Sequence, residues 1–376
     1  MGTSAGEDRC GFRVFVSYSH EDYDKAQVVT AALRELGLEP WLDDHIKPGT
    51  PFTDAIKGMI SHAHVFMPII TPISQQRMWV HQETGFAIGL NIPVLPLAVG
   101  KARDALPQAM PAELQAVKVA EDLSDLKKQL QAINWPDLVL PPPGRPEHIV
   151  AVAQWPEERA ALIAECANRV VCMGARGRMR QIGALSSFCL PDEDIGHPIW
   201  QRREGRVKRS DYFHHLQREE RRALELHARA EGCDLIIDPS IDFRANGPQA
   251  RKARLETLLE FLESMKDHEL KGRGGRRGAL RVAISSRARE INLLLVGDWF
   301  VAESQIPRPT EGYRQTIFNW HAPTVLSHVG KFEAEFEELI SAPGVISGCE
   351  QVIEHIRHII EHEVEPDIEK RRRRRK

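Results

Sequence analysis

Short apolar segments alternate with amphipathic segments over the first third of the chain. Runs of about four to eight apolar and β-branched residues predict buried strands, and they occur at Phe12–Tyr18, Leu38–Asp43, His64–Ile70, Ile92–Val99 and Ala116–Ala120. Helices are predicted between them, for example where Val29, Leu33 and Leu36 recur at helical spacing before Gly37. This alternation predicts a parallel sheet covered by helices on both faces. Ligands bind such sheets beyond the carboxyl ends of the strands, here the loops Ser19–Asp22, Asp43–Phe52 and Thr71–Met78.

A second α/β domain is predicted over residues 149–365. Its expected strands are Arg169–Met173, Cys233–Asp238, Ala279–Ser285 and Ile291–Val296, and its expected helices include Arg218–Ala230 and Leu255–Met265. Residues 136–148 are rich in proline and are interpreted as a linker between this domain and a first domain at residues 10–135. Residues 366–376 are predicted to be a disordered basic tail, because seven adjacent cations repel one another.

Composition narrows the function classes. The formal net charge is −3 although residues 370–376 read KRRRRRK, so the rest of the chain is acidic. The six cysteines are scattered without a C-x-x-C pair, which indicates reduced thiols in the cytoplasm and no zinc site. No apolar run is long enough to span a bilayer, and the first residues lack the features of a secretion signal. We therefore expect a cytoplasmic protein with no membrane partner and no bound metal.

The strand ends carry the candidate chemistry. Neither a G-x-G-x-x-G nor a G-x-x-x-x-G-K-[ST] loop follows the first strand, which argues against a Rossmann dehydrogenase or a P-loop NTPase. On the third helix, Trp79 and Glu83 are four residues apart and therefore share one face. An indole can stack on an aromatic base, and a carboxylate can stabilise the positive charge that develops on a sugar when its bond to that base breaks.

Three segments together resemble the TIR family: FVSYS, WLDDHIKPGTPF, and WVHQE followed by GFA. The resemblance implies a flavodoxin-like parallel sheet, self-association through TIR domains, and an NAD-cleaving enzyme for which NAD is the substrate and no cofactor is needed. WVHQE is similar to the catalytic helix of TIR enzymes that hydrolyse or cyclise NAD. Carried over by position, Glu83 matches the catalytic glutamate, and the substrate-binding positions are Tyr18, Ser19, Asp44, Phe52 and Trp79.

The role of the second domain stays open at the level of sequence. By analogy with bacterial TIR enzymes in prokaryotic defence, it would sense a nucleotide or nucleic-acid signal and switch the enzyme on. Its candidate ligand residues are the arginines of the basic loop KGRGGRRG, namely Arg273, Arg276 and Arg277. A second alternative is a TIR adaptor without enzymatic activity. A third is a C-terminal nucleic-acid-binding or nuclease effector with a metal held by Asp238 and Asp298, provided that these two acids converge.

Overall fold

The structure is a computed structural model. It describes the chain except residues 1–10, 43–51, 77, 105–114, 140–150, 155, 173–176, 184–185, 190–210, 239–246, 272–278, 288–290, 306–314 and 376. The chain divides into two compact units, the first comprising Met1–Val150 with Asn319–Ser327 and the second Ala151–Phe318 with His328–Lys376. Among the described residues, no helix has the length and apolar character needed to cross a membrane.

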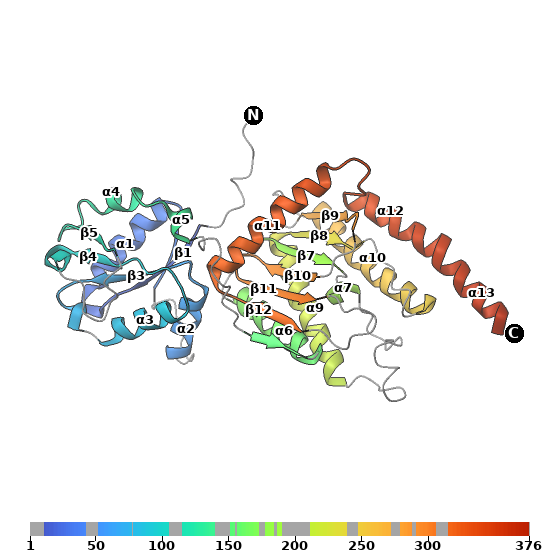
Figure 1. The fold of residues 1–376 in the computed structure, drawn as a ribbon, viewed down its shortest axis with the longest axis horizontal. Helices are drawn as coiled ribbons and strands as arrows, with labels where there is room; N and C mark the ends of the chain where they lie inside the picture. The colour runs from blue at the N-terminus through green and yellow to red at the C-terminus, as the bar shows by residue number, and fades with distance from the viewer. Residues whose placement is uncertain are drawn as a thin grey trace. The chain divides into compact units, whose positions relative to one another are not determined.

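The first unit has the five-stranded parallel sheet that the sequence predicts, in the order β2-β1-β3-β4-β5 (Figure 1). This is the flavodoxin-like order. Its strands are β1 (Arg13–Ser17), β2 (Glu39–Trp41), β3 (Val65–Ile70), β4 (Leu97–Val99) and β5 (Val117–Val119). Its α-helices are α1 (Tyr23–Glu35), α2 (Phe52–His62), α3 (Met78–Gly89), α4 (Leu126–Gln131) and α5 (Trp135–Val139).

Alternation along β1 separates the two faces of this sheet. Val14 and Val16 belong to a hydrophobic cluster that also contains Leu33 of α1 and Leu130 of α4. Phe15 points to the opposite face, where its ring stacks on that of Phe66 with centroids 5.9 Å apart. Ser17, two residues further along the strand, therefore faces the same side as Phe15. This is the side of the sheet on which α3 carries the candidate glutamate.

The second unit is built on a seven-stranded mixed sheet in the order β6-β12-β11-β10-β7-β8-β9. Strands β7, β8 and β9 are parallel, whereas β10 is antiparallel to both β7 and β11. The strands are β6 (Ala151–Ala153), β7 (Met179–Gly183), β8 (Cys233–Ile237), β9 (Leu280–Ile284), β10 (Ile291–Val296), β11 (Phe300–Gln305) and β12 (Thr316–Asn319). The helices are α6 (Pro156–Cys172), α7 (Ser186–Cys189), α9 (Asp211–Glu231), α10 (Pro248–Lys271), α11 (Ala322–Ser341), α12 (Cys349–Ile359), the π-helix η6 (Ile360–Val364) and α13 (Glu365–Arg375). The first residues of α11, up to Ser327, belong to the first unit.

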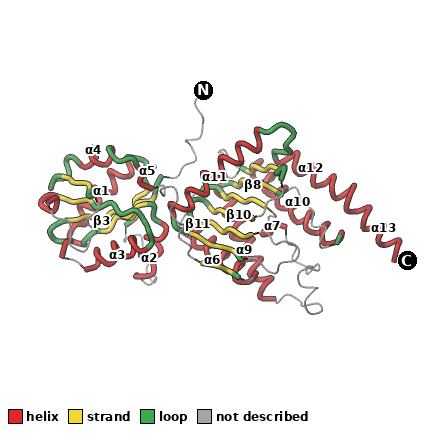
Figure 2. Tube along the Cα trace, in the orientation of Figure 1, coloured by secondary structure: helices red, strands yellow, loops and turns green. Residues whose placement is uncertain are grey.

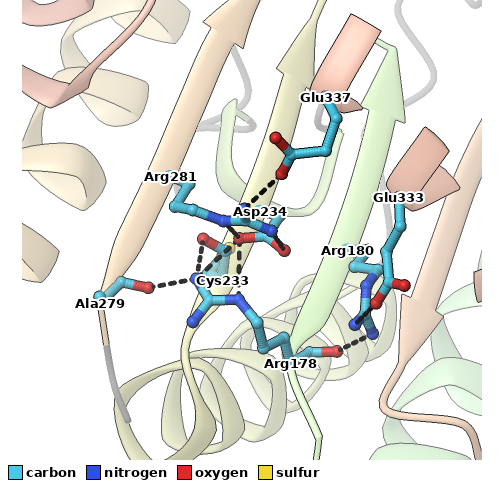
Figure 3. Close-up of polar contacts among 8 residues, drawn as sticks. All are labelled: Arg178, Arg180, Cys233, Asp234, Ala279, Arg281, Glu333 and Glu337. Atoms are coloured by element: carbon cyan, nitrogen blue, oxygen red, sulfur yellow. Dashed lines mark hydrogen bonds and ion pairs between the residues drawn. The ribbon is translucent and has the colours of Figure 1, made fainter. Parts of the chain in front are cut away.

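A buried ionic network joins the sheet of the second unit to helix α11. Asp234 on β8 is fully buried and accepts hydrogen bonds from Arg178, at 2.7 and 2.9 Å, and from Arg281, at 2.8 and 2.9 Å (Figure 3). Arg281 also donates to Glu337 of α11 at 2.9 Å. These guanidinium groups lower the pKa of the Asp234 carboxyl although burial opposes the shift. Both Asp234 oxygens are occupied, so the network stabilises the fold and leaves little capacity for a ligand.

Two predictions of secondary structure, at Arg169–Met173 and at Pro136, differ from the structure. Arg169–Met173 was expected as a strand, but α6 continues through Cys172. Its buried residues Ala160, Ile163 and Ala167 recur at helical spacing, and a short apolar run at the end of such a helix cannot be distinguished from a strand by its pattern. Pro136, expected in the linker, lies in the first turn of α5, where proline is tolerated. Most of the expected linker falls outside the described residues.

The basic tail also differs from expectation, because Glu365–Arg375 forms α13. Ion pairs at i,i+4 spacing link Arg371 to Asp367 and Arg373 to Glu369, and the segment continues directly from α12 and the π-helix. Figure 2 shows these elements in red as one continuous helical run. A helix that is already nucleated extends at low cost, which offsets the repulsion on which the prediction of disorder was based.

Candidate active site

Glu83 lies on the sheet-facing stripe of α3. The stripe consists of Val80, Glu83, Thr84 and Ala87, which are all buried and recur at intervals of three and four residues. Such a stripe is normally apolar, because a carboxylate loses its hydration when it is buried. Glu83 nevertheless is only 6% exposed. A buried acid at an inward position, close to the carboxyl edge of the sheet, is a candidate functional group.

Ser17 contacts this carboxylate. Its hydroxyl donates a hydrogen bond of 2.5 Å to Oε2 of Glu83, and the Ser17 residue is itself only 2% exposed. Ser17 is the last residue of β1, so the bond connects the end of this strand to helix α3 across 66 positions of sequence. A hydrogen bond to an ionised acceptor is stronger than one between neutral groups. Ser17 therefore fixes one oxygen of Glu83 and restricts the orientation of its side chain.

A second set of hydrogen bonds holds the loops on either side of this pair. Asp22, in the loop after β1, accepts a bond of 2.7 Å from the hydroxyl of Thr71, the first residue after β3. The Thr71 amide donates to the Ser74 hydroxyl at 2.8 Å, and the Ser74 amide donates to the Thr71 hydroxyl at 3.1 Å. All three residues are buried. The loops that follow β1 and β3 are thus joined into one frame at the carboxyl edge of the sheet.

The same frame extends to helix α3. The ring nitrogen Nε2 of His81 lies 3.1 Å from the backbone oxygen of Gln75, within the turn that follows Thr71. His81 is two residues before Glu83 on the helix, so this contact fixes the first turn of α3 against the loop.

The other predicted site residues are placed to different degrees. Tyr18 packs into the hydrophobic cluster on the α1 side of the sheet and contacts the rings of His20 and Tyr23, so it faces away from the side that carries Glu83. Ser19 is buried and its hydroxyl donates to the Glu21 carboxylate. Asp44 lies outside the described residues. The backbones of Phe52 and Trp79 belong to α2 and α3, respectively, but their side chains are not described.

Sequence reasoning missed Ser17 as a member of this site and placed Thr71 only within the ligand-facing loop Thr71–Met78. The available signal was a hydroxyl residue at the end of an otherwise apolar buried strand, where a polar group needs a hydrogen-bond partner. That signal shows that a partner must exist, but it does not identify Glu83. Asp22 was predicted only as part of the ligand-facing loop Ser19–Asp22, without its hydrogen-bond partner Thr71.

The candidate metal site of the second unit does not form. The Asp238 amide donates to the Gly183 carbonyl, so Asp238 lies at the carboxyl end of β7 and β8. The Gly297 amide donates to the Arg178 carbonyl, which places the turn that contains Asp298 at the opposite end of β7. The length of a five-residue strand, roughly 16 Å, therefore separates the two acids along the sheet. Among the described residues, no group of three or more His, Cys, Asp or Glu could hold a metal ion.

The candidate sensor residues lie largely outside the described part of the chain. This holds for Arg273, Arg276 and Arg277. The segment Tyr313–His321 also has aromatic and polar residues that could contact a ligand, and Tyr313 lies outside the described residues as well. His321 is described: its amide donates to the Asn319 side chain at 2.9 Å, and its Nδ1 lies 2.8 Å from the Thr324 hydroxyl. These local bonds occur where helix α11 begins. The His321 Nε2 lies 3.0 Å from the backbone oxygen of Asn91, so the ring also contacts the segment that follows α3.

The first unit is thus a flavodoxin-like α/β domain with a buried acid at the carboxyl edge of its parallel sheet. Residues 14–133 match the family model described as TIR domain, and this part of the chain is a TIR domain. The match ends before the second unit, whose family stays unrecognised. No curated protein matches the chain.

Proposed function

We propose that the TIR domain cleaves the bond between nicotinamide and ribose in NAD, with Glu83 as the catalytic carboxylate. The observation that carries the proposal is the burial of Glu83 on the inward stripe of α3 together with its hydrogen bond from Ser17. A TIR domain by itself is compatible with an enzyme or with a signalling adaptor. A shielded and oriented carboxylate at the ligand-binding edge of the sheet favours the enzyme.

The chemistry follows from the charge that develops on the ribose. When the bond to the nicotinamide nitrogen breaks, its electron pair leaves with the neutral base, and the ribose acquires oxocarbenium-like positive charge. A carboxylate in a poorly hydrated site stabilises that charge more strongly than a carboxylate in water. Attack by water on the ribose carbon then gives ADP-ribose and releases a proton. Attack by a nucleophilic atom of the same molecule gives a cyclic product instead.

The direct test measures free nicotinamide after the purified full-length chain is mixed with NAD. The Glu83→Gln variant keeps the shape of the side chain and an acceptor for Ser17 but lacks the charge, so we expect near-total loss of cleavage with little change in melting temperature. The matched control is Glu35→Gln. Glu35 is an exposed acid that ends α1, and its removal should leave cleavage unchanged. Turnover retained by Glu83→Gln, under conditions in which the wild type is active, would overturn the assignment.

We further propose that the second unit controls this activity, in the manner of a defence enzyme that responds to a phosphate-bearing signal. The unit has its own seven-stranded sheet and buried core, as an independent sensing domain requires. If TIR domains act after association, specific activity rises with protein concentration in the presence of a nucleotide or nucleic-acid activator. Charge reversal at Arg273, Arg276 and Arg277 should weaken activation and leave basal cleavage intact. Normal activation of that triple variant would exclude the basic loop as the sensor.

A further inference from the structure

The most concentrated charge in the described structure lies on helix α13. It is the last part of the helical run formed by α12, the π-helix η6 and α13 (Figure 1). The earlier turns of this run are anchored, because Val352, Ile356 and Val364 are fully buried. In contrast, all five residues of Lys370–Arg374 are exposed cations. The helix is therefore fixed to the second unit at its start and presents a basic segment to solvent.

The spacing of these cations surrounds the helix with charge. Successive residues of a helix are rotated by about 100° and rise about 1.5 Å. Lys370–Arg374 therefore distributes five positive charges around the full circumference, within roughly 6 Å along the axis. Arg371 pairs with Asp367 at 3.4 Å and Arg373 with Glu369 at 3.7 Å. These pairs are exposed and weak. No ion pair of Lys370, Arg372 or Arg374 is found within the described part of the chain.

We propose that α13 binds the phosphodiester backbone of duplex nucleic acid without reading its base sequence. Lys370 and Arg374 are four positions apart, so their like charges destabilise the free helix, and a polyanion would remove this repulsion. Four of the five cations are arginines, whose planar guanidinium groups bind phosphate oxygens in pairs. Affinity then comes from phosphate neutralisation and counterion release.

A lipid surface fits this helix less well. A helix that lies in a membrane interface buries an apolar face below the headgroups. The only large apolar side chain in the sequence of α13 is Ile368, which belongs to the turn before the basic segment. Because the cations occupy every side of the helix, α13 has no face that could enter the acyl region. A polyanion that contacts the helix through charge alone is the better match.

The experiment measures binding of the full-length chain to short labelled duplexes by fluorescence anisotropy, between about 0.05 and 0.2 M salt. The probes are two duplex DNAs of unrelated sequence, one duplex RNA, and vesicles that contain phosphatidylserine. The test variant replaces all five cations of Lys370–Arg374 with glutamine, which preserves helix propensity. A matched control variant removes the same charge from five exposed lysines of the TIR domain: Lys57, Lys101, Lys118, Lys127 and Lys128. Circular dichroism checks the helical content of both variants.

We expect the wild type to bind both DNA sequences with affinities within about threefold. Each phosphate contact contributes roughly 0.9 to the slope of log affinity against log salt for duplex DNA, so the test variant should lose about 3 to 4.5 of that slope. The control variant should lose less than about 1. Glu83→Gln should bind as the wild type does, because this surface does not depend on the proposed cleavage of NAD.

Three outcomes would overturn the proposal. The first is a test variant that keeps the salt dependence of the wild type. The second is an equal loss in the control variant, which would show that net charge matters and the location on α13 does not. The third is a wild-type chain that binds the anionic vesicles and neither kind of duplex, which would make α13 a membrane-contacting helix instead.

Discussion

Replacement of Ser17 with alanine should reduce the rate of NAD cleavage much more than it reduces the binding of NAD. The substitution removes a single hydroxyl, the donor of the 2.5 Å hydrogen bond to Oε2 of Glu83. Both residues are buried, so bulk water does not readily replace the lost donor. Ser17 would act as a positioning residue: it orients the carboxylate that meets the developing charge on the ribose.

The expected magnitude follows from the strength of such a bond. A hydrogen bond to a charged group contributes about 1.5–3 kcal/mol, and each 1.36 kcal/mol of lost transition-state stabilisation slows a reaction about tenfold. Ser17→Ala should therefore lower kcat roughly 10- to 100-fold if the orientation of Glu83 limits the chemical step. KM should change much less, because the hydroxyl contacts Glu83 and its loss removes an interaction that matters mainly in the transition state.

The assay is the initial rate of nicotinamide release over a range of NAD concentrations, with a parallel thermal melt. Ser17→Thr restores a hydroxyl and should recover part of kcat. In the Glu83→Gln background, Ser17→Ala should have almost no further effect, because the two residues act as one unit. An unchanged kcat in Ser17→Ala would refute the reasoning. A loss that only follows the fraction of folded protein would assign Ser17 a structural role.

Three further predictions concern the second unit. Asp234→Asn leaves the Arg178 guanidinium without its buried counter-ion, so chemical denaturation should show that the unit is destabilised by about 3 kcal/mol or more. Because the pKa of Asp234 is lowered in the folded chain, the stabilisation by its carboxylate should be present above about pH 3.8 and lost at more acid pH. Burial also lowers the pKa of His227, so His227 takes up a proton at higher pH in the unfolded chain than in the folded chain. The wild type should therefore lose stability relative to His227→Gln as the pH falls below about 6.5. Burial raises the pKa of Cys189 to about 12 and that of Cys233 well above its usual value. Mass spectrometry should therefore find both thiols labelled by a thiol reagent only after unfolding. Labelling of either cysteine in the native chain would contradict their burial.

Local signals account for most of what the sequence predicts correctly. The five strands of the TIR domain were predicted because each is a short apolar run between turn residues, and the flavodoxin-like parallel sheet that the TIR resemblance implies is confirmed. The expectation for Arg169–Met173 was wrong because a short apolar run does not reveal whether it ends a helix or forms a strand. Likewise, α13 is helical because α12 precedes it, a context that the composition of the basic segment does not contain.

The candidate site depends on contacts that no local pattern encodes. Trp79 and Glu83 could be paired from their spacing on one helix. A hydrogen-bond partner of Glu83, however, is Ser17, 66 positions away at the end of β1. The separation of Asp238 from Asp298 is equally non-local, because it depends on β10 running antiparallel to β7. Strand direction decides which ends of two strands meet, and neither sequence segment carries that information alone.

The position of Glu83 also bears on the choice between an enzyme and an adaptor. Its neighbours on the inward stripe of α3 are Val80, Thr84 and Ala87, and an apolar residue at position 83 would complete the stripe without the desolvation of a carboxylate. A domain that only recruits partners through its surface gains nothing from a buried acid at this place. An enzyme gains a functional group from such an acid, and functional groups are commonly retained at the expense of stability. Glu83→Gln distinguishes the two roles. If Glu83 is catalytic, the variant should lose activity with a nearly unchanged melting temperature. If Glu83 is structural, the variant should lose stability while the partner-binding surface stays intact.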